Sequence, residues 1–148
     1  MARAKISVVG CKDLYVCSYY RPKVDDRDSL DLLFSSLDRI CNSKNCHIWL
    51  AGDFNFLGIY WSSKTLKHNC PSSDLNELFV KSLDDYGLTQ MVDKPTRLSN
   101  TLDLFVTNNP TFIAEIKVIP GPADHDAVTI KRDISPIVNK QKPRKIQL

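Results

Sequence analysis

The amino-acid sequence predicts an α/β (α+β) protein with a mixed sheet and helices on one face. Two observations predict this class. Apolar runs of strand type alternate with two segments of helical spacing, and both short turns and helices connect the strand-type runs. A chain of 148 residues that is 43% hydrophobic and 25% charged is typical of one globular domain. We therefore expect one domain over residues 1–135, followed by a basic tail over residues 136–148.

The N-terminal third is expected to form a hairpin followed by a helix. The runs KISVV (5–9) and LYVCSYY (14–20) flank the turn-type residues GCKD, which is the pattern of two connected strands. Apolar residues then recur at helical spacing between positions 30 and 40, with Asp28 or Ser29 as the N-cap.

The middle of the chain is expected to form a buried strand and a second helix. HIWLAG (47–52) is apolar almost throughout, which is typical of a strand covered on both faces. Residues 62–73 are polar and predict a loop. Asp74 then caps a helix, with Glu77 three residues later in the capping-box position.

Four further strands are predicted in the second half. LTQMV (88–92) is a short strand, and TLDLFVTN (101–108), AEIKVIPG (114–121) and AVTIKRD (127–133) are longer ones. The residues DKPTRLSN (93–100) predict a loop. Because the helices are expected on one face of the sheet, its other face needs a different cover.

Composition argues against several classes of protein. No apolar run approaches the ~20 residues needed to span a membrane, and the first apolar stretch is too short for a signal peptide. These absences predict an intracellular protein, of nucleus or cytoplasm. The five cysteines are odd in number and form no C-x-x-C pair, which argues against a disulfide framework or a zinc ribbon. Four basic residues lie in the last ten positions, and without them the net charge falls from +3 to −1. The body of the chain is therefore not a basic nucleic-acid-binding surface by charge alone.

Polar side chains occur at the ends of several predicted strands, where α/β proteins commonly carry their sites. Asp53 and Asn55 follow the buried strand. They form either an Asx-type turn or a carboxylate and an amide beside a reacting oxygen. Asp103 interrupts an apolar strand, so it is either a buried carboxylate that needs a charged or imidazole partner or an exposed residue of an edge strand. His125 lies between two carboxylates at a strand start, a setting that suits acid–base chemistry.

These positions together indicate metal-assisted phosphodiester chemistry. Tyr19 and Tyr20 close a strand and point to opposite faces, so one belongs to the core and the other can reach a site. Asp124 adds a third carboxylate. The chain has no glycine-rich phosphate loop, no G-x-S-x-G motif and no zinc spacing of Cys and His. Carboxylate oxygens suit Mg²⁺ or Ca²⁺, with water as the nucleophile.

Four motifs, YYRP, WLAGDFN, LDLFVTN and ADHDAV, occur in this order, and their candidate site residues run from Tyr20 to His125. In this order they resemble the motifs of the endonuclease/exonuclease/phosphatase superfamily, which has the four-layer α/β sandwich of DNase I. The stretch KPTRLSNTLDLFVTN is especially similar to the apurinic-type endonuclease domain of non-LTR (LINE-like) retrotransposons. KPRKIQL is similar to the start of the linker that leads to reverse transcriptase in that group. The resemblance implies a hydrolase that cleaves DNA with Mg²⁺ or Mn²⁺.

The resemblance also implies a role for each matched residue. Asp53 resembles the Asp that orients or deprotonates the attacking water, and Asn55 resembles the Asn that helps to bind the scissile phosphate. His125 resembles the His that stabilises the charge developing on the phosphate, and Asp103 resembles the Asp that orients this His. Asp124 resembles the Asp that contributes to the metal site.

The sequence departs from the superfamily pattern at several positions. Tyr20 resembles the Tyr whose hydroxyl contacts the phosphate, but the Asn usual three residues later is Lys23, and the Ser usual before Asp124 is Ala123. No segment ahead of the first motif matches the superfamily's N-terminal Asn and its Glu, the principal metal ligand. We therefore expect residues 1–135 to be the C-terminal part of such a domain. Its metal site would be weak, and one sheet face would lack its usual cover.

Three functional hypotheses follow from the sequence. The first is a DNA endonuclease domain of retrotransposon type that is inactive or weak as this truncated chain. Its partners would be DNA and either a missing N-terminal half or the reverse transcriptase domain of a parent polyprotein, with no membrane and no small-molecule cofactor. The second is a degenerate, non-catalytic fragment that serves as a binding module or is inert. The third is a hydrolase of the same superfamily that acts on inositol phosphates or sphingomyelin.

Overall fold

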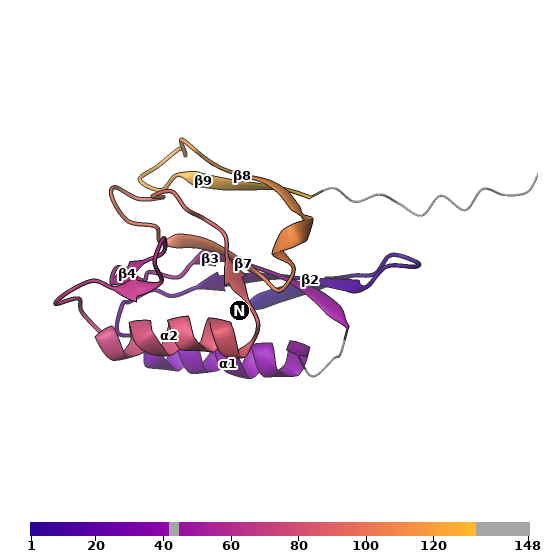
Figure 1. Ribbon diagram of the computed structural model, residues 1–148, viewed down its shortest axis with the longest axis horizontal. Helices are drawn as coiled ribbons and strands as arrows, with labels where there is room; N and C mark the ends of the chain where they lie inside the picture. The colour runs from indigo at the N-terminus through magenta and orange to yellow at the C-terminus, as the bar shows by residue number, and fades with distance from the viewer. Residues whose placement is uncertain (42–44, 133–148) are drawn as a thin grey trace, which may run out of the picture.

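Five strands form a mixed sheet (Figure 1). They are β1 (Ala2–Ile6), β2 (Asp13–Tyr20), β3 (Cys46–Asp53), β6 (Thr89–Gln90) and β7 (Asp103–Thr107). The structure is a computed structural model that describes residues 1–41 and 45–132. The sheet order is β1-β2-β3-β7-β6, and only the β2–β3 pair is parallel among these described strands. The predicted mixed sheet is therefore confirmed.

Both helices pack on one face of this sheet, and a hairpin lies on the other face (Figure 1). α1 (Arg27–Cys41) connects β2 to β3, which supplies the crossover that a parallel pair requires. α2 (Ser73–Asp85) precedes β6. β8 (Ile113–Ile119) and β9 (Ala127–Arg132) pair as the antiparallel hairpin. The prediction of helices on one face is also confirmed.

Three short elements do not follow the sequence prediction. β4 (Ile59–Tyr60) and β5 (Thr65–Leu66) form a two-stranded ribbon, and the 3-10 helix η1 (Pro110–Phe112) follows β7. The prediction of an unbroken loop over residues 62–73 is therefore wrong. The ribbon is anchored by Ile59, whose side chain is buried in the core. Strands of two residues are too short to leave a periodic signal in the sequence.

Both helices begin differently from the prediction. Asp26 caps α1, because its Oδ1 accepts a hydrogen bond from the backbone N–H of Ser29 at 2.9 Å. Asp28 lies inside the first helical turn, so neither residue expected as the cap fills that position. α2 begins directly after Ser72, whose backbone is left-handed and whose side chain makes no capping bond. The capping box expected to begin at Asp74 is therefore wrong.

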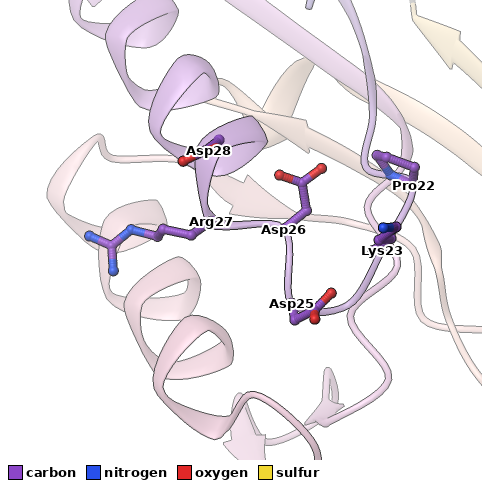
Figure 2. A pocket seen from close by; sticks show the side chains of 6 residues that line it. All are labelled: Pro22, Lys23, Asp25, Asp26, Arg27 and Asp28. Carbon is purple, nitrogen blue, oxygen red and sulfur yellow. The ribbon is translucent and has the colours of Figure 1, made fainter.

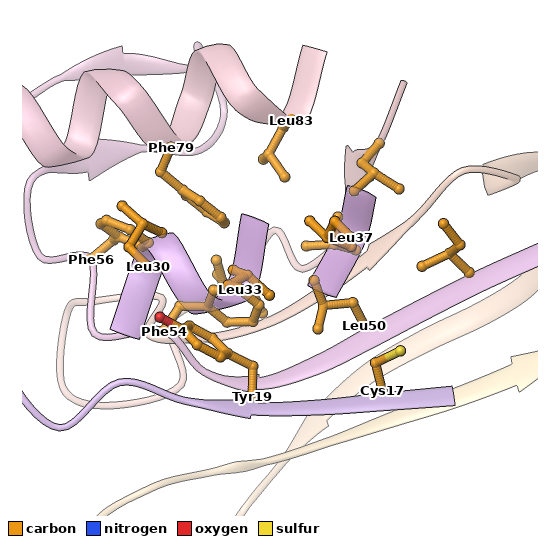
Figure 3. Close-up of a cluster of buried hydrophobic side chains, with 14 of the residues drawn as sticks. Cys17, Tyr19, Leu30, Leu33, Leu37, Leu50, Phe54, Phe56, Phe79 and Leu83 are labelled. Atoms are coloured by element: carbon orange, nitrogen blue, oxygen red, sulfur yellow. The ribbon is translucent and has the colours of Figure 1, made fainter. Parts of the chain in front are cut away.

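The main core lies between the two helices and the sheet (Figure 3). The ring of Phe79, from α2, stacks on Phe56 with 4.3 Å between centroids and also contacts Phe54 and Trp61. The helices and strands bury further side chains around these rings: Cys17, Tyr19, Leu30, Leu33, Leu37, Leu50 and Leu83. This packing fixes the helix layer against β2 and β3.

The β8–β9 hairpin covers part of the opposite sheet face. The rings of Trp49 and Phe105 meet edge to face at 5.6 Å, and the guanidinium of Arg132, from β9, lies 6.0 Å from the Trp49 ring. A shallow groove of about 500 Å³ remains over β1, β2 and β3. The expectation of a sheet face without its cover therefore holds for the β1–β2 side and is wrong for the β3–β7 side.

Three further sequence predictions concern single features. All five cysteines lie in the described part of the chain and are free, as expected. Neither described helix combines the length and apolar character needed to cross a membrane. The predicted tail over residues 136–148, and with it the domain end at residue 135, lies outside the residues that the structure describes.

Gly52 lets β3 approach β2 where a side chain cannot fit. A Cβ atom at this position would lie 1.9 Å from the carbonyl oxygen of Tyr19, and φ is +143°. We expect Gly52→Ala to lower the free energy of unfolding by about 3–5 kcal/mol. Gly87→Ala is the matched control, because Gly87 also has a positive φ, but a Cβ atom added there would meet no atom within 4 Å beyond its chain neighbours, and the change should cost about 1–2 kcal/mol. Urea denaturation of both variants measures the difference, and equal losses would contradict this account.

Candidate active site at one edge of the sheet

Strand pairing brings three of the predicted residues into one row. Parallel pairing sets Tyr20 beside Asp53, and antiparallel pairing sets Asp53 beside Asp103. Paired residues point to the same face of a sheet. Tyr19 is buried in the helix-side core, and its hydroxyl lies 3.0 Å from Ser29 Oγ. Tyr20, Asp53 and Asp103 therefore line the hairpin side of the sheet, at the edge where β2 and β3 end.

His125 joins this row through Asp103. The Nδ1 atom of His125 lies 2.8 Å from Asp103 Oδ2, and both side chains are less than one-third exposed. Of the two settings that the sequence left open for Asp103, the structure thus has the one with a charged or imidazole partner. The hydrogen bond to Asp103 raises the pKa of His125 above its ordinary value. Because Nδ1 is engaged, the other ring nitrogen, Nε2, is the one left for other contacts.

Asp53 sits in a turn as well as in the row. Its Oδ1 accepts a hydrogen bond from the backbone N–H of Asn55 at 3.0 Å, and Asn55 has a left-handed φ of 52°. This is the Asx-type turn that the sequence left open. Burial, followed by the charge of Asp103, raises the pKa of Asp53. The turn bond uses only the Oδ1 atom of Asp53, so Oδ2 remains available for a role in the site.

Arg21 closes the strand after Tyr19 and Tyr20 and holds this turn, a role that the sequence analysis did not predict. Its guanidinium is fully buried and lies 3.8 Å from the centroid of the Phe56 ring. Nε donates to the carbonyl oxygen of Phe54 at 2.9 Å, and Nη2 donates to that of Asn55 at 3.2 Å. Burial lowers the pKa of Arg21. Arginine side chains are usually exposed, and nothing in the local sequence of the YYRP motif indicates that this one is buried.

Two of the predicted residues are largely exposed. Asp124 is 66% exposed, and its Oδ2 lies 2.6 Å from Nη2 of Arg97. The Tyr20 side chain shares the face of Asp53 but is 65% exposed. Arg97 was not singled out by the sequence analysis, because a pair so distant in the chain leaves no local pattern. The structure therefore groups Asp53, Asp103 and His125 closely, with Asn55 and Tyr20 beside them and Asp124 at the margin.

The described residues do not fit a Mg²⁺ ion by themselves. No group of three or more His, Cys, Asp or Glu that could hold a metal occurs within residues 1–41 and 45–132. Mg²⁺ takes near-octahedral oxygen ligands. One Asp103 oxygen is bound by His125, and one Asp124 oxygen is bound by Arg97. A complete site would need a further carboxylate ligand.

A pocket of about 550 Å³ lies beside the end of β2 (Figure 2). The loop before α1 and the first helical residues line it: Pro22, Lys23, Asp25, Asp26, Arg27 and Asp28. Three of these residues are acidic, which does not suit a phosphate. Asp26 is already used to cap α1. The row at the sheet edge, and not this pocket, is therefore the candidate site.

The fold is similar to the DNase I-like fold of the nuclease and phosphatase superfamily, and an Asp, an Asp–His pair and an adjacent Asn and Tyr lie at its sheet edge. Residues 14–129 match the family model described as endonuclease-reverse transcriptase. The chain belongs to this endonuclease-reverse transcriptase family.

Comparison with solved structures supports the fold. The chain is similar to the 3′ phosphatase NExo from Neisseria, which was solved with a product DNA hairpin. The TM-score is 0.53 at 16% sequence identity, over 86% of this chain and 63% of the Neisseria chain. The chain thus spans less than two-thirds of that enzyme. A comparison with curated proteins found no match.

The buried guanidinium of Arg21 gives a test of how the Asp53 turn is held. We expect Arg21→Lys to lower the free energy of unfolding by about 2–4 kcal/mol, because an ammonium cannot reproduce two directed bonds and a stacked contact in a buried position. Arg39→Lys is the matched control. Arg39 Nε also donates to a backbone carbonyl, at 3.1 Å, but is exposed, so the change should stay within about 0.5 kcal/mol. Urea denaturation compares the two, and a tolerated Arg21→Lys would contradict the role given to Arg21.

Proposed function

We propose that the chain forms part of a Mg²⁺-dependent DNA endonuclease of the non-LTR retrotransposon type. The observation that carries the proposal is the row of Asp53, Asp103 and His125 on one side of the sheet edge. The family match supports an endonuclease associated with reverse transcriptase. The DNA hairpin bound to the similar Neisseria enzyme supports DNA as the substrate class.

Each residue of the row has a task in this proposal. Asp53 orients the attacking water and accepts its proton, and its raised pKa makes it a better proton acceptor. His125 is held by Asp103 and directs Nε2 at the phosphate, where a protonated imidazole stabilises the charge that develops in the transition state. Asn55 and Tyr20 offer an amide and a hydroxyl to the phosphate oxygens from the margin of the row.

Weak activity is part of the proposal. Mg²⁺ bound at a complete site would neutralise the phosphate charge and activate water, but the described residues lack a fitting ligand set. A second candidate function, a non-catalytic binding module or inert remnant, is favoured by the ion pair that occupies Asp124. Because this chain is expected to be weak or inactive in both cases, the two candidates differ in whether the chain contacts DNA.

Cleavage is tested by nicking of supercoiled plasmid. In Mg²⁺ or Mn²⁺ we expect this chain to nick no faster than its Asp53→Ala variant, because the ligand set is incomplete. Conversion to open circles is followed on gels, with chelator added in a parallel reaction. Robust nicking that disappears in Asp53→Ala would contradict the expected inactivity and would establish catalysis by this row.

DNA binding is tested separately, by fluorescence anisotropy with a labelled duplex. We expect binding that weakens steeply as salt rises, because phosphate contacts release counterions. Arg97→Gln should weaken binding uniformly across duplex sequences, since Arg97 lies beside the row. Arg39→Gln, at an exposed helix position, is the charge-matched control. No binding at low salt would remove DNA as the partner and would favour the inert remnant.

A further inference from the structure

Thr96 makes more contacts at the candidate site than its place in a loop suggests. The residue is fully buried. Its Oγ1 accepts hydrogen bonds from the backbone N–H groups of Leu102 at 3.1 Å and Asp103 at 3.0 Å. Its carbonyl oxygen accepts a third bond, from the backbone N–H of Asp126 at 2.7 Å. One residue therefore binds the backbone on both sides of the Asp103–His125 contact.

The two backbones that Thr96 joins come from distant parts of the chain. Asp103 begins β7, in the sheet. His125 lies in the bend before β9, where its neighbours Asp124 and Asp126 are exposed. A short hydrogen bond between the side chains of such residues requires that both backbones be fixed, because a displacement of about 1 Å is enough to lose it. Thr96 fixes the first through its hydroxyl and the second through its carbonyl.

The residues around Thr96 support this arrangement. The backbone N–H of Thr96 donates to the carbonyl oxygen of Asn100 at 2.9 Å, and Arg97 and Asn100 bond each other in both directions. The loop is thus a closed tight turn. The Arg97 side chain then pairs with Asp124, so the residues on both sides of His125 are bound to the Thr96–Arg97 dipeptide.

We propose that Thr96 is the positioning residue of the Asp103–His125 pair. It acts through backbone groups and does not reach the row itself. Removing a buried acceptor would leave two buried N–H groups without a partner, and the start of β7 would shift to recover their bonds. The catalytic meaning of this positioning rests on the proposed function, whereas the positioning itself does not.

The test reads the ring of His125 in the chain without DNA or metal. Nitrogen-15 chemical shifts report which ring nitrogen carries the proton. In the wild type we expect Nδ1 of His125 to be protonated and to show a downfield N–H resonance, because it donates to Asp103. His47 serves as the internal control. Its Nδ1 faces the side-chain amide of Asn109 at 3.1 Å, so its proton should reside on Nε2.

Two substitutions separate the hydroxyl from the shape of Thr96. Thr96→Val keeps the shape and removes the acceptor, so we expect the Nδ1–H resonance of His125 to be lost and its tautomers to mix. Thr96→Ser keeps the hydroxyl and should restore the wild-type signature. His47 should not change in either variant. A folded Thr96→Val protein with an unaltered His125 signature would overturn the proposal.

A second measurement covers the case in which Thr96→Val does not fold. In the wild type, the amide protons of Asp103 and Asp126 should exchange with solvent at similar, protected rates, because Thr96 binds both. Rapid exchange at Asp126 beside an intact His125 signature would overturn the proposal. These readouts need no catalysis. A chain that does not bind DNA would therefore remove the proposed function and leave the positioning role of Thr96 standing.

Discussion

Two carboxylates lie side by side because the register of β3 and β7 pairs Asp53 with Asp103. Like charges placed opposite each other in a sheet are destabilising, and the groups around them reduce this cost. His125 binds Asp103, and the backbone N–H of Asn55 binds Asp53. Burial is the main cause of the raised pKa of Asp53, and the charge of Asp103 adds to it. The proximity of the two carboxylates thus adds to the proton affinity that acid–base chemistry uses.

The row is held from behind by two buried polar residues that do not belong to it. Arg21 binds the two carbonyls that follow Asp53, and Thr96 binds the N–H of Asp103. One supplies donors to a turn, and the other supplies acceptors to a strand start. Both act on backbone groups, which would otherwise be buried without partners. The positions of the site side chains therefore depend on two residues that present no reactive group to the row and so give no sign of a role at the site.

Local pattern was enough to predict the helices, the longer strands and, as one of two alternatives, a charged or imidazole partner for Asp103. Alternation along β7 set Asp103 against the apolar residues, and burial then demanded a partner. The ribbon that buries Ile59 and the bonds of Arg21 and Thr96 were not predictable. These features depend on contacts between segments that are distant in the sequence. Each involves only two or three residues, which is too few to produce a periodic pattern. The N-cap of α1 was missed because Asp26, Asp28 and Ser29 are all good capping residues and only geometry selects one.

The Arg97–Asp124 ion pair bears on how the site could take a metal. In the described structure a guanidinium compensates the charge of Asp124 at 2.6 Å, so the folded state does not depend on a metal to neutralise that carboxylate. A divalent ion at Asp124 could use only the carboxylate oxygen that Arg97 leaves open, and it would still need further ligands that the described residues do not provide.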